Sequence, residues 1–135
     1  CIIFSKKELL DFSVLESLFV KKGVDCIVLA GFLLKIPEKM IAKYPKKILN
    51  LHPSLLPKYG GVGMYGLNVH ESVLKNKEIE SGITIHLVNK DYDKGEVLFQ
   101  KKCLISKNES VSSLSQKIKL LEHKYFPAII KKHLL

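Results

Sequence analysis

The segment that most constrains the fold runs from Asn50 to Pro53 and follows the apolar pair at 48–49. Asn50 and His52 stand two residues apart, so on an extended strand their side chains share one face, about 6.5–7 Å apart. Pro53 has no N–H to donate, so a central strand should end before it. The pattern predicts an amide and an imidazole at the end of a strand, where open α/β sheets bind ligands.

Two interpretations of this pair are open. In the first, Asn50 donates hydrogen bonds to a developing oxyanion and His52 moves a proton. In the second, both are strand-end residues satisfied by loop backbone, and the prolines at 53 and 57 only shape a turn. Spacing alone favours the second interpretation, because short motifs have a high false-positive rate.

Composition and charge narrow the class of protein. The 135 residues are 47% hydrophobic and 26% charged, which is typical of a soluble protein, and we expect 1–135 to form a single domain. No apolar run approaches the ~20 residues of a membrane helix, and no signal peptide is visible. All 22 basic residues are lysine, spread along the chain. Because nucleic-acid readers favour arginine, we expect the net charge of +9 to serve solubility, with neither nucleic acid nor membrane as a partner.

The three cysteines, at 1, 26 and 103, are odd in number and far apart. They form no C-x-x-C, so neither a zinc knuckle nor a disulfide framework is predicted, and a reducing cytoplasm fits. Cys26 is expected to be a small core residue. The histidines lack ligand spacing, so no metal site is predicted.

Hydrophobic periodicity predicts alternating helices and strands, which indicates an α/β fold. Helices are expected over 7–22, 37–42, 69–76 and 110–133, and strands over 26–30, 47–51, 82–88 and 96–105. The apolar run at 26–30 is typical of a buried parallel strand, and the polar residues at 100–102 indicate an edge strand. Pro127 should bend or interrupt the last helix. In the first helix the inward side chains are expected to be Leu10, Val14, Leu15 and Leu18.

The glycines of 61–66 match G-x-G-x-x-G letter for letter. A dinucleotide site needs a strand immediately before the first glycine, whereas a turn precedes it here. We expect a loop that folds over a ligand or turns corners.

Four segments together resemble the folate-dependent formyltransferases in order and spacing: 30–32, 50–58, 82–86 and 91–95. The similarity covers essentially the whole chain. His52-Pro-Ser-Leu-Leu-Pro57 resembles the members that act on glycinamide ribonucleotide. Members that act on methionyl-tRNA usually have Gly after the His, and deformylases a second His. The resemblance implies a Rossmann-like fold with a mostly parallel sheet, flanking helices and an antiparallel edge, lacking the family's N-terminal strands.

The resemblance implies transfer of a formyl group from 10-formyltetrahydrofolate to the amine of glycinamide ribonucleotide, a step of purine biosynthesis. Asn50, His52 and Asp93 correspond to the family's catalytic triad. In that chemistry Asn50 donates to the oxyanion, His52 shuttles protons, and Asp93 favours the imidazolium. No metal or covalent intermediate is needed.

The resemblance also implies binding residues. Those implied for the reduced folate are Phe32, Leu33, Leu34, Lys35, Ile36, Asn50, Asn89, Lys90, Asp91, Tyr92 and Asp93, and those for the substrate are Pro53, His86 and Glu122. Glu122 could equally be a solvent-facing helix acid, and His86 a satisfied core histidine. His70, His123 and His133 are expected to be ordinary helix residues.

One departure from the family pattern concerns the substrate phosphate. The family holds it with an N-terminal strand and loop at a helix N-terminus, and no such segment is present in 1–135. We therefore expect the catalytic and folate-binding portion of a transferase. A formyltetrahydrofolate hydrolase and a non-catalytic nucleotide-binding remnant stay as alternatives, and a homodimer stays open. A serine hydrolase is not supported, because no G-x-S-x-G is present.

Overall fold

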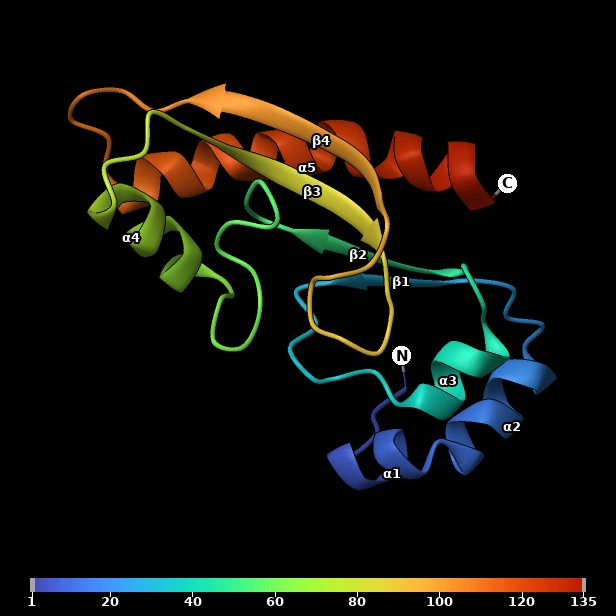
Figure 1. The fold of residues 1–135 in the computed structure, drawn as a ribbon. Helices are drawn as coiled ribbons and strands as arrows, with labels where there is room; N and C mark the ends of the chain where they lie inside the picture. Colours follow the sequence, from blue (N-terminus) through green and yellow to red (C-terminus); the bar gives the residue numbers. More distant parts are fainter. Residues whose placement is uncertain (1, 135) are drawn as a thin grey trace.

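The computed structural model describes residues 2–134, which form a mixed sheet with helices packed around it (Figure 1). Its strands are β1 (Ile27–Ala30), β2 (Ile48–His52), β3 (Glu80–Leu87) and β4 (Val97–Leu104), in the spatial order β1-β2-β3-β4. β1 pairs parallel with β2, whereas the β2–β3 and β3–β4 pairs are antiparallel. The helices are α1 (Lys6–Asp11), α2 (Ser13–Lys21), α3 (Glu38–Lys43), α4 (Leu67–Lys75) and α5 (Val111–Leu134). The predicted Rossmann-like α/β class is confirmed, but the expected mostly parallel sheet is not found among the described strands, because one pair is parallel and two are antiparallel.

Helices cover the sheet in two groups (Figure 1). α5 runs along β3 and β4, and α4 packs beside its first turns, where Ile83, Leu114 and Ile118 are buried together. α1, α2 and α3 gather near β1 around a separate cluster that includes Ile48. Neighbouring Leu49 belongs to a third cluster with residues of β3 and α5. β2 therefore buries both of its faces, as a central strand does.

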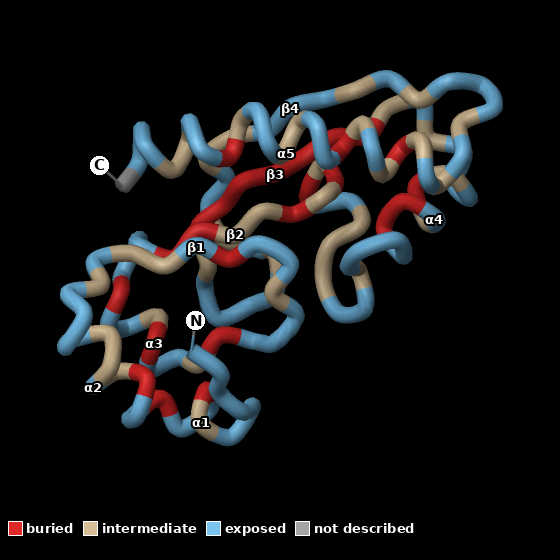
Figure 2. The backbone as a smooth tube through the Cα atoms, turned by 180° about the vertical axis from the view of Figure 1, so that it is seen from behind, coloured by how far each residue is buried: buried red, intermediate tan, exposed pale blue. Residues whose placement is uncertain are grey.

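Burial differs sharply between the two antiparallel neighbours β3 and β4 (Figure 2). Residues 81–87 of β3 are all buried, while β4 is largely exposed. The predicted edge position of the last strand is confirmed. β2 ends at His52, immediately before Pro53, also as predicted.

The predicted helix over 7–22 is wrong in one respect, because it is broken into α1 and α2 at Phe12. Phe12 adopts a left-handed conformation with φ +63°, and its side chain is 1% exposed. The break rotates the inward face. Leu15 is buried as expected, but Leu10 and Val14 are exposed. Burial of the Phe12 ring offsets the cost of this unusual backbone.

Two further expectations need correction. The strand at 26–30 is less buried than its apolar composition predicted: Val28 is exposed, Cys26 is half-buried, and Leu29 alone of β1 is buried. β1 lies at the end of the strand order, so one of its edges has no described neighbour. Pro127 does not interrupt α5, which continues to Leu134. Pro127 lies on the exposed side, where water can reach the carbonyl that it leaves unpaired. Among residues 2–134, no helix is both long and apolar enough to span a bilayer.

Candidate active site

The register of the sheet brings the first polar cluster together. β2 and β3 pair so that Asn50 lies opposite His86 and His52 lies opposite Thr84. Directly opposed residues project from the same face of a sheet. The carboxyl ends of the parallel strands β1 and β2 meet at one edge, so the segment after Ala30 also lies beside His52.

Asp93 joins this cluster from the connection between β3 and β4. Its Oδ2 lies 3.5 Å from Nδ1 of His52 and accepts a hydrogen bond of 2.9 Å from the N–H of Gly61. Its Oδ1 lies 3.5 Å from Nε2 of His86 and 3.4 Å from Nδ2 of Asn50. The structure therefore brings together the three residues of the predicted triad, with His86 as a fourth member.

Two backbone carbonyls fix the ring protons of the histidines. Nε2 of His52 lies 2.7 Å from the carbonyl oxygen of Tyr59, and Nδ1 of His86 lies 2.8 Å from that of Leu87. A carbonyl only accepts, so each of these nitrogens carries a proton. Nε2 of His86 can then accept the 3.1 Å hydrogen bond from Asn50 Nδ2. Nδ1 of His52, facing Asp93, is the nitrogen that is left to gain and release a proton.

Burial and charge act in opposite directions on this cluster. Burial of His52, which is 4% exposed, lowers its pKa, while Asp93 and the Tyr59 carbonyl partly oppose the shift. For Asp93, burial alone would raise the pKa. The net effect is nevertheless a lowered pKa for Asp93, to which the Gly61 N–H and positive charge on His52 contribute. The two directions favour an ionised Asp93 carboxylate beside a neutral His52 ring.

The loop that carries Asp93 has a defined conformation. Asn89 accepts a hydrogen bond from the N–H of Asp91 and donates one to the carbonyl of Lys94. Asp93 itself has φ +53°, a left-handed conformation that aspartate tolerates better than most residues. A Cβ at Gly95 would lie 1.6 Å from the Leu87 carbonyl oxygen, so only glycine fits there. These contacts return the chain to β4 in a way that turns the Asp93 carboxylate toward His52.

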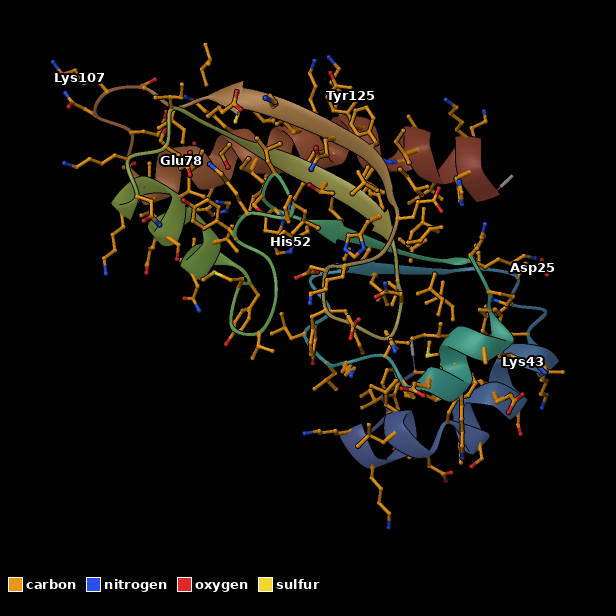
Figure 3. All side chains as sticks on the ribbon, viewed as in Figure 1. Asp25, Lys43, His52, Glu78, Lys107 and Tyr125 are labelled. Atoms are coloured by element: carbon orange, nitrogen blue, oxygen red, sulfur yellow. The ribbon has the colours of Figure 1, made fainter. Side chains whose placement is uncertain are left out.

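A cavity of about 600 Å³ opens beside the cluster. This volume lies in the range of small-molecule sites. Figure 3 places His52 at the end of β2, between the loop after Pro53 and the β3–β4 connection. The cavity is lined by all the predicted site residues except Lys90: Phe32, Leu33, Leu34, Lys35, Ile36, Asn50, His52, Pro53, His86, Asn89, Asp91, Tyr92, Asp93 and Glu122. The glycine loop 61–66 lines it as well.

Glu122 lines the cavity from α5, and burial raises the pKa of its carboxyl. This placement differs from the solvent-facing alternative. His86 is 2% exposed and both of its ring nitrogens have partners, so it is a satisfied core histidine that also borders the cavity.

Sequence reasoning missed part of the cavity wall. Ser115, Ile118 and Lys119 line it together with Glu122, and these positions follow helical spacing along one face of α5. His70, expected to be an ordinary helix residue, is 4% exposed and lines the cavity from α4. Burial and then the nearby charge of Lys119 lower the pKa of His70. Extending the α5 face backward from Glu122 would have found the first three residues.

Within residues 2–134, no group of three or more His, Cys, Asp or Glu side chains is placed to hold a metal ion. Cys26 and Cys103 carry free thiols. The site at the end of β2 combines a mostly apolar cavity wall, an amide that can donate to an oxyanion and one imidazole nitrogen that can move a proton.

Comparison with known proteins places the chain in a family. Residues 5–130 match the family described as formyl transferase. A chloroplastic phosphoribosylglycinamide formyltransferase of Arabidopsis thaliana is 42% identical over 110 residues, covering 82% of this chain and 38% of the relative. The human trifunctional purine biosynthetic protein adenosine-3 is 34% identical over 119 residues, covering 88% of this chain and 11% of that protein.

Comparison with solved structures gives the same family. The phosphoribosylglycinamide formyltransferase from Bacillus halodurans superposes with a TM-score of 0.82 at 29% identity, covering 96% of this chain and 63% of that one. That from Coxiella burnetii gives a TM-score of 0.79 at 35% identity, covering 89% of this chain and 55% of that one. This chain thus spans less than two thirds of each of these relatives. The match over residues 5–130, together with the shared fold, shows that the chain belongs to the formyl transferase family.

Proposed function

We propose that residues 1–135 form a single formyltransferase domain, the catalytic and folate-binding portion of an enzyme that transfers a formyl group from 10-formyltetrahydrofolate to the amine of glycinamide ribonucleotide. The observation that carries the proposal is the meeting of Asn50, His52 and Asp93 at the cavity wall. The names of the relatives, phosphoribosylglycinamide formyltransferase and a purine biosynthetic protein, support the choice of substrate.

The proposed reaction needs two proton movements and one oxyanion. The substrate amine attacks the formyl carbon and forms a C–N bond, and the carbonyl oxygen becomes an oxyanion. The attacking nitrogen loses a proton, the folate nitrogen gains one, and the bond between that nitrogen and the formyl carbon breaks. Every atom is balanced between the two substrates, so no covalent intermediate on the protein is required.

Asn50 supplies the oxyanion donor in this proposal. Of its two amide hydrogens, one is held by His86 at 3.1 Å and the other makes the longer contact of 3.4 Å to Asp93. The longer contact is weak by geometry, so the hydrogen that makes it is available to a new oxyanion. One such donor typically contributes about 3–4 kcal/mol to transition-state stabilisation.

His52 moves the proton through Nδ1, because its Nε2 is bonded to the Tyr59 carbonyl. Asp93 stabilises the imidazolium that forms when Nδ1 takes up the proton. The burial that lowers the pKa of His52 favours release of this proton in the next step.

The cavity wall accounts for the proposed binding of the folate. The strip 32–36, including Lys35, offers mostly apolar side chains, and Leu33 and Leu34 are exposed enough to meet a ring. The loop 89–93 is proposed to contact the pteridine through its backbone, with Lys90 contributing its backbone rather than a lining side chain. Pro53, His86 and Glu122 are proposed to border the ribonucleotide. Neither binding nor chemistry in this proposal uses a metal.

Location and assembly remain parts of the proposal. We propose a reducing compartment, the cytoplasm, in keeping with the free thiols of Cys26 and Cys103. Only small molecules are proposed as ligands, with no nucleic acid or membrane. A homodimer stays a prediction, which sedimentation at two protein concentrations tests.

The experiment that tests the function follows folate absorbance while the protein is mixed with 10-formyltetrahydrofolate, with and without glycinamide ribonucleotide. A parallel titration measures folate binding. Transfer that requires the ribonucleotide supports the proposal. Formate release without it supports the hydrolase instead. Folate binding without transfer indicates that residues 1–135 do not supply the phosphate contact, and tight nucleotide binding without folate binding supports the non-catalytic alternative.

A further inference from the structure

A buried hydroxyl bonds to backbone carbonyls within the loop that follows His52. Ser54 is 1% exposed, and its Oγ donates to the carbonyl of Lys58 at 2.8 Å. It also lies 3.4 Å from the carbonyl of Tyr59. That carbonyl is the one that receives the Nε2 proton of His52. The position of Ser54 therefore bears directly on the orientation of the imidazole.

Thr84 on β3 holds the same loop from the sheet. Its Oγ1 donates to the carbonyl of Ser54 at 2.6 Å and accepts from the N–H of Leu56 at 3.0 Å. Thr84 is fully buried. A hydroxyl has one hydrogen and two lone pairs, so a single acceptor site remains on it.

Gln100 on β4 fills that last site. Its side-chain nitrogen donates to Thr84 Oγ1 at 2.9 Å and to the carbonyl of Leu56 at 2.8 Å. Both amide hydrogens are thus used, and every hydrogen-bonding capacity of the Thr84 hydroxyl is satisfied. Gln100 itself is an exposed residue of the edge strand, but Thr84 is buried, so a shift that breaks these bonds leaves a buried hydroxyl unpaired.

We propose that Gln100 is a positioning residue for His52, acting through Thr84, Ser54 and the Tyr59 carbonyl. Gln100 is not among the residues that line the cavity, so it acts without touching a substrate. The proposal rests on the assigned role of His52 in formyl transfer, but its structural part can be measured separately.

The physical consequence concerns the tautomer of His52. With the Tyr59 carbonyl in place, the neutral ring keeps its proton on Nε2 and leaves Nδ1 free. If the carbonyl moves away, the neutral ring gains more by placing its proton on Nδ1 and donating it to Asp93. Nδ1 can then no longer take up a proton from the substrate.

The test uses Gln100→Met, which keeps the length of the side chain and removes its donors. Thr84→Val, of nearly equal volume, breaks the next link, and Thr84→Ser keeps the hydroxyl. Lys102→Leu is the matched control, since Lys102 is an exposed residue two positions along the same strand whose side chain bonds Glu80 instead of the loop after His52. Long-range ¹H–¹⁵N spectra of the histidine rings report the tautomer of His52, and steady-state kinetics report kcat and KM.

In Gln100→Met and Thr84→Val, the His52 tautomer is expected to shift from Nε2–H toward Nδ1–H. The misplaced His52 ring should lower kcat by about tenfold to a hundredfold. KM for the folate should change less than about twofold, because the cavity wall is untouched. Thr84→Ser and Lys102→Leu should resemble the unmodified protein in both readouts.

An unchanged His52 tautomer in both folded variants would overturn the proposal, whatever happens to kcat. A fall in thermal stability without a tautomer shift would assign Gln100 a purely structural role and also overturn it. If the unmodified protein shows no transfer while the tautomer responds to Gln100→Met, the proposed function fails and the positioning of His52 by Gln100 stands.

Discussion

His52 and Asp93 face each other with Nδ1 3.5 Å from Oδ2, although they belong to different parts of the chain. The same carboxylate oxygen is held by the N–H of Gly61, and the opposite nitrogen of His52 is held by the Tyr59 carbonyl. A backbone group therefore holds each partner of the pair in place: the Gly61 N–H holds Asp93, and the Tyr59 carbonyl holds His52. Preorganisation of this kind would let His52 take up a proton beside the Asp93 charge without first rearranging.

Replacing Asp93 by Asn should lower the pKa of His52. Burial already lowers that pKa and the Asp93 charge opposes the shift, so removing the charge leaves burial less opposed. An NMR titration of the His52 ring should show its midpoint at lower pH than in the unmodified protein. Formyl transfer should fall by about 10²–10⁴-fold. Asp25→Asn, at an exposed aspartate outside the cavity wall, is the control, and an unchanged or higher His52 midpoint in Asp93→Asn would contradict the pairing.

Stability should fall as the pH drops below about 6.5. Both His52 and His70 have a folded-state pKa lowered by burial, so the unfolded chain takes up protons that the folded chain does not. The contribution of these histidines to the free energy of unfolding is fully present above the unfolded pKa near 6.5. It is lost as the pH falls toward the lower folded pKa values, by up to about 1.4 kcal/mol per pH unit for each histidine. Urea unfolding at several pH values measures the slope.

Two variants isolate the contribution of His70 to that slope. His70→Gln removes the titrating group and should flatten the pH dependence, whereas Asn68→Gln on the same helix should keep it. Asp93 affects stability in a lower pH range than the histidines do. Because its pKa is lowered, its contribution to the free energy of unfolding is present above about pH 3.9 and is lost at still lower pH. Equal slopes in His70→Gln and the unmodified protein would show that His70 is not buried as a neutral ring.

Replacing Leu34 by Asp should weaken folate binding and leave the fold intact. Leu34 lines the cavity and is 37% exposed, so a carboxylate there meets water until a ligand covers it. Because burying a leucine contributes about 1.5–3 kcal/mol, the folate dissociation constant should rise about tenfold or more. Leu120→Asp, at a 71% exposed site on α5, is the control. Equal affinity in both variants would place the folate elsewhere.

Replacing Gly95 by Ala should displace the loop that carries Asp93. A Cβ there meets the Leu87 carbonyl oxygen at 1.6 Å, and the backbone has to move to relieve the overlap. We expect a loss of about 1–3 kcal/mol in unfolding free energy, together with a marked loss of transfer. Gly23→Ala makes no new contact within 4 Å and costs only its φ of +62°, about 1–2 kcal/mol. Gly23→Ala should therefore keep its activity, and full activity in Gly95→Ala would show that the loop position does not matter.

Local sequence rules predicted the part of the site that lies on β2. A proline after an apolar strand marks the strand end, and two-residue spacing puts Asn50 and His52 on one face, as the structure has them. Asp93 could be assigned only by resemblance. Its approach to His52 depends on the pairing of β3 with β2, on the loop geometry and on Gly95, none of which leaves a periodic signal.

Other features are settled by tertiary packing and could not be predicted locally. No Gly or Pro marks the break at Phe12, whose left-handed backbone accompanies a ring that is buried in the cluster shared by the first three helices and β2. Gln100 was interpreted as part of a polar edge, and only the structure shows both of its amide hydrogens bonded inward to the loop after His52.

The central claim is that His52 and Asn50, together at the cavity, carry out formyl transfer to the ribonucleotide amine. The most direct measurement compares the unmodified protein with His52→Ala and Asn50→Ala for transfer from 10-formyltetrahydrofolate, with folate binding measured in parallel. The predicted result is transfer in the unmodified protein, a loss of about 10²–10⁴-fold in His52→Ala, and folate binding retained in that variant. Undiminished transfer in His52→Ala would contradict the account.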